Sequence, residues 1–523
     1  MRKLLLALLS IFVFSSMGAQ TLQDAYKMLN YENFPKSKKA MQQYIQQNPG
    51  SQEAQFALGA LLSRTNKLDS AAILFNKVME INPKAAISQV AAGYIALNKK
   101  NTAETKLNFD RAIKTSKSKD GNIYRLIGEA WLYSPNKNLD EAIENLKKAV
   151  AIEIKNPISY FSLGEAYYKK GELGQAVTQY EFTTDYDKTA AWAYSRVGEI
   201  FKAAKNYPKA LESLESAVKA DPEYPFTYKE LADWYYDYQK YADALINFEK
   251  YLKLTGDNSI DTKIRYSSIL FYNKQYDKTI SLVNEILKVD SSRNYMVRLL
   301  GYSYFEQGDS LAARNMMNKY FAKATPDKII YSDYQYLAKT QLKFGQDSLA
   351  FLSYEKSIAT DSTKVDVYNE LATLYYSKGK YLNAAKTYAR KLTKLERPSL
   401  QNYFDVAFAY YKAQDYQNAL VAFGKISEKW PDRLEGHIYQ ARSAAFLDPE
   451  STQQMAKPYY DKVIEKGEVD PVKYKDYLME AYSYMYYLAL NAKDKVTAKT
   501  FVDKMLKIDP NNEETVKLLK ATE

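Results

Sequence analysis

Residue types that perform chemistry are scarce in this chain. Its single histidine is His437, and it has no cysteine. One histidine offers no convincing Ser-His-Asp triad and no histidine-rich metal site. Without cysteine there can be no thiolate nucleophile, no disulfide and no lipid-modified N-terminal Cys. We therefore interpret His437 as a residue on a helix face.

Ser-x-x-Lys pairs such as Ser216/Lys219 and Ser353/Lys356 are the remaining candidates for a nucleophile. A serine activated by a lysine uses this spacing, but a chain rich in both residue types produces it by chance. No phosphate-binding loop of the form G-x-x-x-x-G-K-[ST] or G-x-G-x-x-G is present. The sequence therefore predicts a protein that is not an enzyme and that uses no cofactor and no metal.

The elements that carry these residues are predicted to be helices. Hydrophobic residues make up 46% of the 523 residues, and only 18 Gly and 15 Pro interrupt the chain. So few breakers favour helices over strands and turns. Tyrosine occurs 49 times, and its large ring with a polar tip suits both packed helices and binding surfaces.

The charge pattern argues against nucleic acid as a partner. The net charge is +11, from 73 Lys and Arg against 62 Asp and Glu. Both signs alternate along the chain, and no long basic run occurs. This pattern is typical of a solvated surface and not of a nucleic-acid footprint.

The N-terminus has the pattern of a secretory signal peptide over residues 1–19. Arg2 and Lys3 precede the apolar run Leu4–Phe14, which is shorter than the ~20 residues of a spanning helix. Cleavage is expected after Ala19, with Gly18 as the alternative. We expect a periplasmic protein, with secretion as the second choice and no transmembrane segment in the mature chain.

The rest of the chain repeats with one period. We number the window Ala191–Tyr224 from Ala191 as position 1. Small residues then stand at positions 8 and 20, large residues at 4, 7, 11 and 24, and a proline at 32. These residues are Gly198, Ala210, Tyr194, Val197, Phe201, Leu214 and Pro222. They resemble the tetratricopeptide repeat, whose 34-residue unit is a pair of antiparallel helices. The small positions let the two helices cross closely, and the proline ends the second helix.

The same register predicts repeats along nearly the whole chain. Their first residues are Gln52, Ala86, Gly121, Pro157, Ala191 and Pro225, and further repeats begin near Ile260, Asn294, Tyr331, Val365 and Leu400. A degenerate copy spans 435–470, and slips occur near 258 and 328. The predicted fold is all-α, a right-handed superhelical solenoid of about fourteen helix pairs. We divide it into an N-terminal array (20–258), a continuous C-terminal array (259–510) and a capping tail (511–523).

The resemblance implies that the first helices of the repeats line a concave groove and that positions 2, 5, 9, 12 and 13 face a ligand. The aromatic candidates at these positions are Phe161, Tyr168, Trp192, Phe226, Tyr236, Tyr302, Tyr376, Phe404, Phe408 and Tyr411. The charged candidates are Glu165, Glu199, Lys229, Asp233 and Arg298. The tyrosines at position 12 either bind a partner or pack on the next hairpin, and the sequence leaves both open.

Position 9 carries an acid in four successive repeats: Glu129, Glu165, Glu199 and Asp233. If these side chains face inward, that part of the groove is acidic and favours a peptide with Lys or Arg. Some family members use a set of Lys and Asn residues as a carboxylate clamp. Lys229 and Arg298 match that set only in isolation, so the clamp is not expected here.

These features favour a non-catalytic scaffold of the bacterial cell envelope that holds peptides or partner proteins in its groove. A glycan-binding protein is the alternative, because Tyr and Trp faces also stack on sugar rings. Competition by polysaccharide fragments, or by peptides and salt, would distinguish the two. The sequence does not specify the partner or whether the chain associates with itself.

Overall fold

The computed structural model describes residues 22–522, and this part of the chain is helical without a single strand. The predicted signal peptide lies outside the described residues. The chain forms two compact units, one up to Leu282 and one from Val283 onward. We call them unit 1 and unit 2 and describe each separately.

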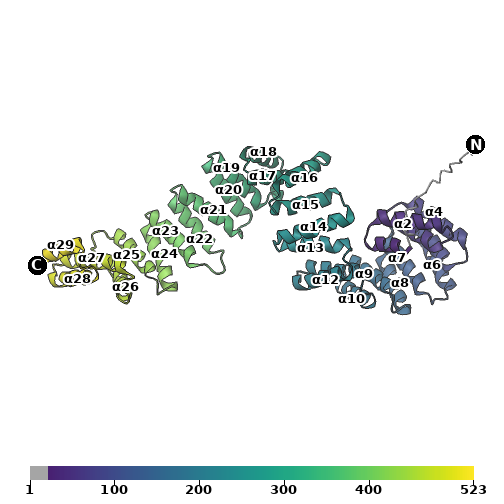
Figure 1. Ribbon diagram of the computed structural model, residues 1–523, viewed down its shortest axis with the longest axis horizontal. Helices are drawn as coiled ribbons and strands as arrows, with labels where there is room; N and C mark the ends of the chain where they lie inside the picture. The colour runs from purple at the N-terminus through teal and green to yellow at the C-terminus, as the bar shows by residue number, and fades with distance from the viewer. Residues whose placement is uncertain (1–21, 523) are drawn as a thin grey trace, which may run out of the picture. The chain divides into compact units, whose positions relative to one another are not determined.

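Unit 1 is built from short antiparallel helices joined by tight turns (Figure 1). Its helices are α1 (Leu22–Asn30), α2 (Phe34–Gln47), α3 (Gln52–Arg64), α4 (Leu68–Ile81), α5 (Ala86–Asn98), α6 (Thr102–Thr115), α7 (Gly121–Tyr133), α8 (Leu139–Ile152), α9 (Pro157–Lys170), α10 (Leu173–Tyr186), α11 (Ala191–Ala203), α12 (Tyr207–Ala220), α13 (Pro225–Asp237), α14 (Tyr241–Thr255) and α15 (Ile260–Tyr272). The next helix, α16 (Tyr276–Val289), contains the boundary between the units.

Unit 2 continues with the same kind of hairpin. Its helices are α17 (Asn294–Glu306), α18 (Ser310–Phe321), α19 (Tyr331–Lys343), α20 (Asp347–Thr360), α21 (Val365–Ser377), α22 (Tyr381–Leu392), α23 (Leu400–Lys412), α24 (Tyr416–Lys429), α25 (Leu434–Leu447), α26 (Lys457–Gly467), α27 (Lys475–Asn491), α28 (Lys495–Ile508) and α29 (Glu513–Thr522). Figure 1 shows each hairpin stacked against the next along the unit. The predicted all-α fold of consecutively packed helix pairs is confirmed.

Each of the eleven predicted repeat openings, from Gln52 to Leu400, is the first residue of a helix. Local chemistry explains the agreement. The Asn156 side chain accepts hydrogen bonds from the N–H groups of Ile158 and Ser159, and Pro157 occupies the first helical position, where its missing N–H costs nothing. The degenerate repeat, predicted from Glu435, begins at Leu434.

The slip near residue 328 and the degenerate repeat coincide with longer connections, whereas the slip near 258 falls in the short connection between α14 and α15. Between α18 and α19 the chain adds the 3₁₀ helix η1 (Pro326–Lys328). Between α25 and α26 the carboxylate of Asp448 accepts hydrogen bonds from the backbone N–H groups of Thr452, Gln453 and Met455. These irregular loops replace the tight turns of the regular repeats.

The core of each hairpin depends on a small residue where its helices cross. A Cβ added to Gly93 in α5 would lie 2.3 Å from the Phe109 ring in α6, and one added to Gly198 would lie 2.7 Å from Leu214. The partner residues Phe109 and Leu214 are themselves buried. The backbones therefore approach too closely for a methyl group, and the larger side chain of the second helix fills the remaining space.

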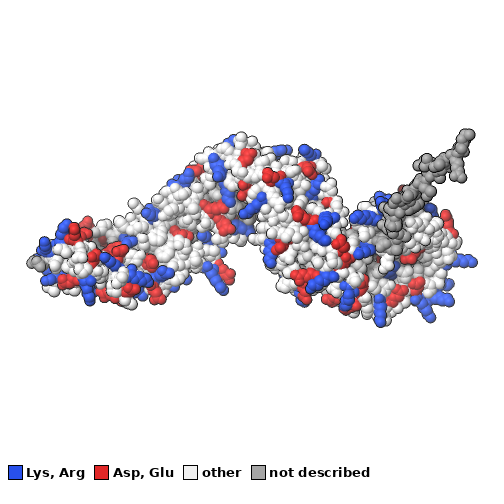
Figure 2. Space-filling model, in the orientation of Figure 1, with Lys and Arg blue, Asp and Glu red and all other residues white. Residues whose placement is uncertain are grey.

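Lys and Arg are interspersed with Asp and Glu on the face of the molecule that Figure 2 shows. Between residues 22 and 522, no helix is both long enough and apolar enough to cross a membrane.

We predict that Gly93→Ala destabilises its hairpin by about 1–3 kcal/mol, because the added methyl group overpacks the contact with Phe109. Adding Phe109→Leu to this variant should recover part of the loss. Urea unfolding together with hydrogen exchange of α5 and α6 measures the effect.

The matched control is Gly174→Ala in α10, where an added Cβ meets nothing within 4 Å. It should be neutral or stabilising by up to about 1 kcal/mol, because alanine is the better helix former. Equal losses in the two variants would contradict the packing explanation.

Candidate functional site

The first helices of successive hairpins lie against one another within each unit. In unit 1 these contacts join α3 to α5, α5 to α7 and α7 to α9, and α3 also reaches α7. In unit 2, α17 contacts α19 in the same way. The predicted groove residues all lie on these first helices, so their side chains meet across neighbouring repeats.

The acids at position 9 are paired and do not form an open acidic surface. Glu165 is 3% exposed; it accepts hydrogen bonds from Arg196 Nε at 2.9 Å and from the Tyr180 hydroxyl at 2.8 Å. Glu199 accepts from another Arg196 nitrogen at 2.9 Å and from the Tyr168 hydroxyl at 2.9 Å. Burial, together with the bond to Glu199, raises the pKa of Tyr168 to about 12.

The same pairing recurs from repeat to repeat. Glu165 pairs with Arg196 across 31 residues, and Asp233 pairs with Arg265 at 2.6 Å across 32 residues. In unit 2 the charges are reversed, and Lys339 Nζ lies 2.9 Å from a Glu370 oxygen. Position 9 of one repeat thus meets position 6 of the next. The expected preference for Lys or Arg peptides is corrected accordingly, since arginines within the chain already neutralise these acids.

Glu129, also at position 9, contacts position 6 of the next repeat as well, but the residue there is a serine. Its carboxylate lies 2.7 Å from Arg125 of the same helix and accepts a hydrogen bond from the Ser162 hydroxyl at 2.8 Å. The four acids therefore act as links between the first helices of unit 1.

The aromatic candidates of unit 1 are half-buried among other side chains. Phe161 and Trp192 meet edge to face with ring centroids 6.4 Å apart. Trp192 and Phe226 both pack against a cluster that includes Tyr31 and Tyr224. The N-terminal hairpin thus covers part of the surface that was expected to face a partner.

Tyr236 and Lys229 also contact their own neighbours. The Arg265 guanidinium lies 4.0 Å from the centre of the Tyr236 ring, and Lys229 Nζ lies 5.9 Å from that of Tyr251. For Tyr168 and Tyr236, the two tyrosines at position 12 in unit 1, the structure favours packing.

Two predicted residues of unit 2 belong to a buried polar network centred on Asp333. Asp333 is fully buried and accepts hydrogen bonds from the hydroxyls of Tyr302 (2.5 Å) and Tyr320 (3.0 Å) and from Ile330 N–H (2.8 Å). Arg298 lies 3.4 Å from the same carboxylate. Tyr302 is only 7% exposed, so it is corrected from a candidate for partner contact to a structural residue.

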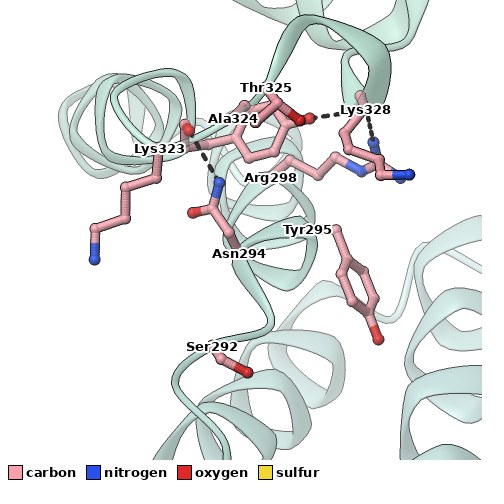
Figure 3. A pocket seen from close by; sticks show the side chains of 9 residues that line it. Ser292, Asn294, Tyr295, Arg298, Lys323, Ala324, Thr325 and Lys328 are labelled. Atoms are coloured by element: carbon pink, nitrogen blue, oxygen red, sulfur yellow. Dashed lines mark hydrogen bonds between the residues drawn. The ribbon is translucent and has the colours of Figure 1, made fainter.

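A cavity of about 380 Å³ lies beside this network. It is lined by Ser292, Asn294, Tyr295, Arg298, Tyr320, Lys323, Ala324, Thr325 and Lys328. Figure 3 shows Arg298 reaching toward Lys328 and Asn294 bonded to the backbone. The loop that contains η1, at the predicted slip near residue 328, builds one wall of this cavity.

The remaining aromatic candidates gather in unit 2. Phe404, Phe408 and Tyr411 of α23 lie next to Tyr439 and Phe446 of α25, and we call these five residues the aromatic strip. Ring centroids are 5.5 Å apart for Phe404 and Phe408, 4.7 Å for Phe408 and Tyr439, and 6.0 Å for Tyr411 and Phe446. Phe446 is 53% exposed. The strip therefore ends in a ring that is open to solvent.

Arg442 lies over the Tyr439 ring of the strip. Its guanidinium lies 4.7 Å from the centre of the Tyr439 ring and donates two hydrogen bonds, at 2.9 and 2.6 Å, to Glu480 of α27. Sequence reasoning missed Tyr439, Arg442 and Phe446 because the repeat pattern is degenerate there. The aromatic residues of 435–470 were the available signal. The predicted Tyr376 lies outside the strip and packs on Tyr381 at 5.0 Å.

His437 lies on α25, as expected for a helix-face residue. Its Nε2 atom is buried and has no hydrogen-bond partner among the described residues. Burial lowers the pKa of His437, and the nearby Lys466 and Lys462 lower it further, against a smaller opposing effect of Glu465. The folded chain therefore resists protonation of this imidazole.

We predict that acidification through about pH 6.5, the ordinary histidine pKa, destabilises the region around α25 and α26. The folded-state pKa lies below the unfolded value, so the stabilisation is complete above that pH and is lost as the pH falls. Hydrogen exchange measured across this range should show faster opening at the lower pH. The variant His437→Gln should remove the difference, and an unchanged difference in that variant would contradict the assignment.

We predict that Asp333→Ala destabilises the α17–α19 region by about 3–5 kcal/mol, because it removes the buried carboxylate that Arg298, Tyr302, Tyr320 and the Ile330 N–H share. Hydrogen exchange of α17 and α19 measures the loss. The control Asp327→Ala removes a solvent-exposed carboxylate paired with Lys328 and should leave exchange unchanged. A small effect of Asp333→Ala would show that the network is dispensable.

Comparison with known proteins gives the same repeat. A family profile described as TPR repeat matches residues 136–171. One described as Tetratricopeptide repeat matches residues 30–86 and 161–225, and a second with the same description matches residues 401–433.

Similar proteins support this match over longer stretches. The chain is 22% identical over 442 residues to a TPR repeat-containing protein of Methanocaldococcus jannaschii, covering 76% of this chain and 74% of that protein. It is 30% identical over 155 residues to Hsp70-Hsp90 organizing protein 3 of Arabidopsis thaliana, covering 30% of this chain and 26% of that protein.

A solved structure, the C-terminal part of a TPR repeat-containing protein from Cytophaga hutchinsonii, is 31% identical and has a TM-score of 0.33. The match covers 49% of this chain and 98% of that one. The helix register, the small crossing residues and the matched repeat profiles identify the chain as a tetratricopeptide-repeat protein.

Proposed function

We propose that this protein is a non-catalytic scaffold of the bacterial cell envelope and that it binds partner proteins or peptides through the aromatic strip of unit 2. The observation that carries the proposal is the strip itself, five aromatic rings in contact on α23 and α25 that end in the exposed Phe446. Aromatic rings supply most of the binding energy where a partner buries them.

The strip is ordered before any partner arrives. Tyr416 stacks on Phe446 with ring centroids 4.4 Å apart, and Phe423 stacks on Tyr439 at 4.9 Å. Rings held in this way lose little conformational freedom on binding. Arg442 is engaged by Glu480, so the surface beside the rings carries no uncompensated charge from this residue. The strip therefore suits a segment that presents two or three large apolar side chains.

The relatives support protein binding as the general role. The Arabidopsis relative is named an Hsp70-Hsp90 organizing protein, which describes a protein that acts on other proteins. For the present chain we infer only the class of partner from this, a protein or peptide. The envelope location rests on the signal-peptide pattern of residues 1–19, and cell fractionation with mass spectrometry of the mature N-terminus tests it.

We predict that a photo-crosslinking amino acid at position 446 captures a small set of proteins in living cells, because this ring is the exposed end of the strip. Once a partner protein has been captured, Phe446→Ala and Tyr411→Ala should each weaken its binding to the chain by about 2 kcal/mol. Calorimetry or fluorescence anisotropy measures the affinities.

The matched control is Val421→Ala in α24, which removes a side chain with the same 53% exposure as Phe446 and should leave the affinity unchanged. Equal losses in strip and control variants would place the binding surface elsewhere. If the natural chain binds soluble polysaccharide fragments and crosslinks no protein, the glycan alternative replaces this proposal.

A further inference from the structure

The first hairpin of unit 1 contacts two hairpins that lie far away in the sequence. The turn between α1 and α2 carries Tyr31 and Glu32, and it lies against α11 and the loop between α12 and α13. We call Lys27, Met28, Tyr31 and Glu32 the clasp. The residues that receive it, Trp192, Arg196, Asp221, Tyr224 and Phe226, form the seat.

Polar contacts give the clasp a specific geometry. The Tyr31 hydroxyl donates a short hydrogen bond to the Asp221 carboxylate, 190 residues downstream, and Lys27 Nζ lies 3.3 Å from the same carboxylate. Glu32 accepts a hydrogen bond from Arg196 at 2.9 Å across 164 residues. Arg196 thus joins one carboxylate of the clasp to the two structural acids Glu165 and Glu199.

Apolar contacts complete the fit. The Tyr31 ring meets the Tyr224 ring edge to face with centroids 5.5 Å apart, and these residues are 7% and 5% exposed. Met28, Trp192 and Phe226 pack around the two rings. Two of the aromatic residues that the repeat pattern assigns to partner binding in unit 1, Trp192 and Phe226, are therefore covered by a tyrosine from the same chain.

The clasp differs from the contacts that hold the stack together. In a repeat solenoid each unit is stabilised by its immediate neighbours, whereas the clasp joins the first hairpin to the sixth and seventh. It is supplied by the nine-residue α1 and its turn, and a helix of this length is marginal without tertiary contacts. Releasing the clasp leaves the contacts between neighbouring hairpins from α3 onward intact.

We propose that the seat is a binding surface for a segment with the chemistry of the clasp, a tyrosine followed directly by a carboxylate and preceded by a lysine one helical turn earlier. The N-terminal clasp occupies this surface in cis, and a partner segment of the same chemistry binds when the clasp is released. The hydroxyl-to-carboxylate bond selects tyrosine over phenylalanine, and the guanidinium of Arg196 selects the acid that follows.

The test uses the full-length mature chain and a labelled peptide of residues 22–36. The variant Tyr31→Ala/Glu32→Gln weakens the clasp without altering the seat. We expect the peptide to bind this variant about tenfold or more tightly than it binds the natural chain, where the tethered clasp competes at high effective concentration. A peptide that carries the same two substitutions should bind neither chain.

Two further measurements distinguish release of the clasp from misfolding of the variant. The single variant Tyr31→Phe removes only the hydroxyl and should also increase peptide binding, by a smaller factor. The cysteine-free chain allows spin labels at the exposed positions Gln23 and Glu223, and the distance distribution should be narrow in the natural chain and broad in the double variant.

Equal peptide affinity for the natural and double-variant chains would overturn the proposal. So would peptide binding that ignores the tyrosine and the acid, or a spin-label distribution that the double variant leaves narrow. None of these outcomes depends on the aromatic strip of unit 2.

Discussion

The close crossing of two helices within each hairpin is the constraint on which the rest of the structure depends. It requires a small residue such as Gly198 in the first helix and a large buried residue such as Leu214 in the second. Because the distance between the helix axes is set in this way, every hairpin presents a similar face to the next. The first helices then lie against one another, and their side chains meet on a common surface.

That meeting explains why so little of the inner surface of unit 1 remains open. An acid at one position and an arginine one repeat later, as in Glu165 with Arg196 and Asp233 with Arg265, tie neighbouring first helices together. Partly buried pairs of this kind are weak evidence for extra stability but can be costly to break. They fix how neighbouring hairpins align. Because these acids are already paired with arginines, they do not form an open acidic surface in unit 1.

The two proposed binding surfaces lie where the regular stacking is modified. In unit 2 the degenerate repeat places Tyr439 and Phe446 beside the regular α23, which creates a row of aromatic rings with an exposed end. In unit 1 the turn after α1 covers aromatic residues of α11 and α13. Both features consist of packed aromatic and charged side chains.

The sequence by itself determined the helix pairs, their first residues from Gln52 to Leu400, and the small and large residues at the crossings, because each depends on neighbours within about one repeat. It also determined that His437 lies on a helix face. Only the tertiary structure decided that Glu165 and Tyr302 are buried, that Phe446 extends the aromatic strip, and that Tyr31 lies against Tyr224. Contacts across many repeats depend on the curvature of the stack. That curvature is the sum of small rotations between hairpins, and a periodic pattern of residue types does not contain it.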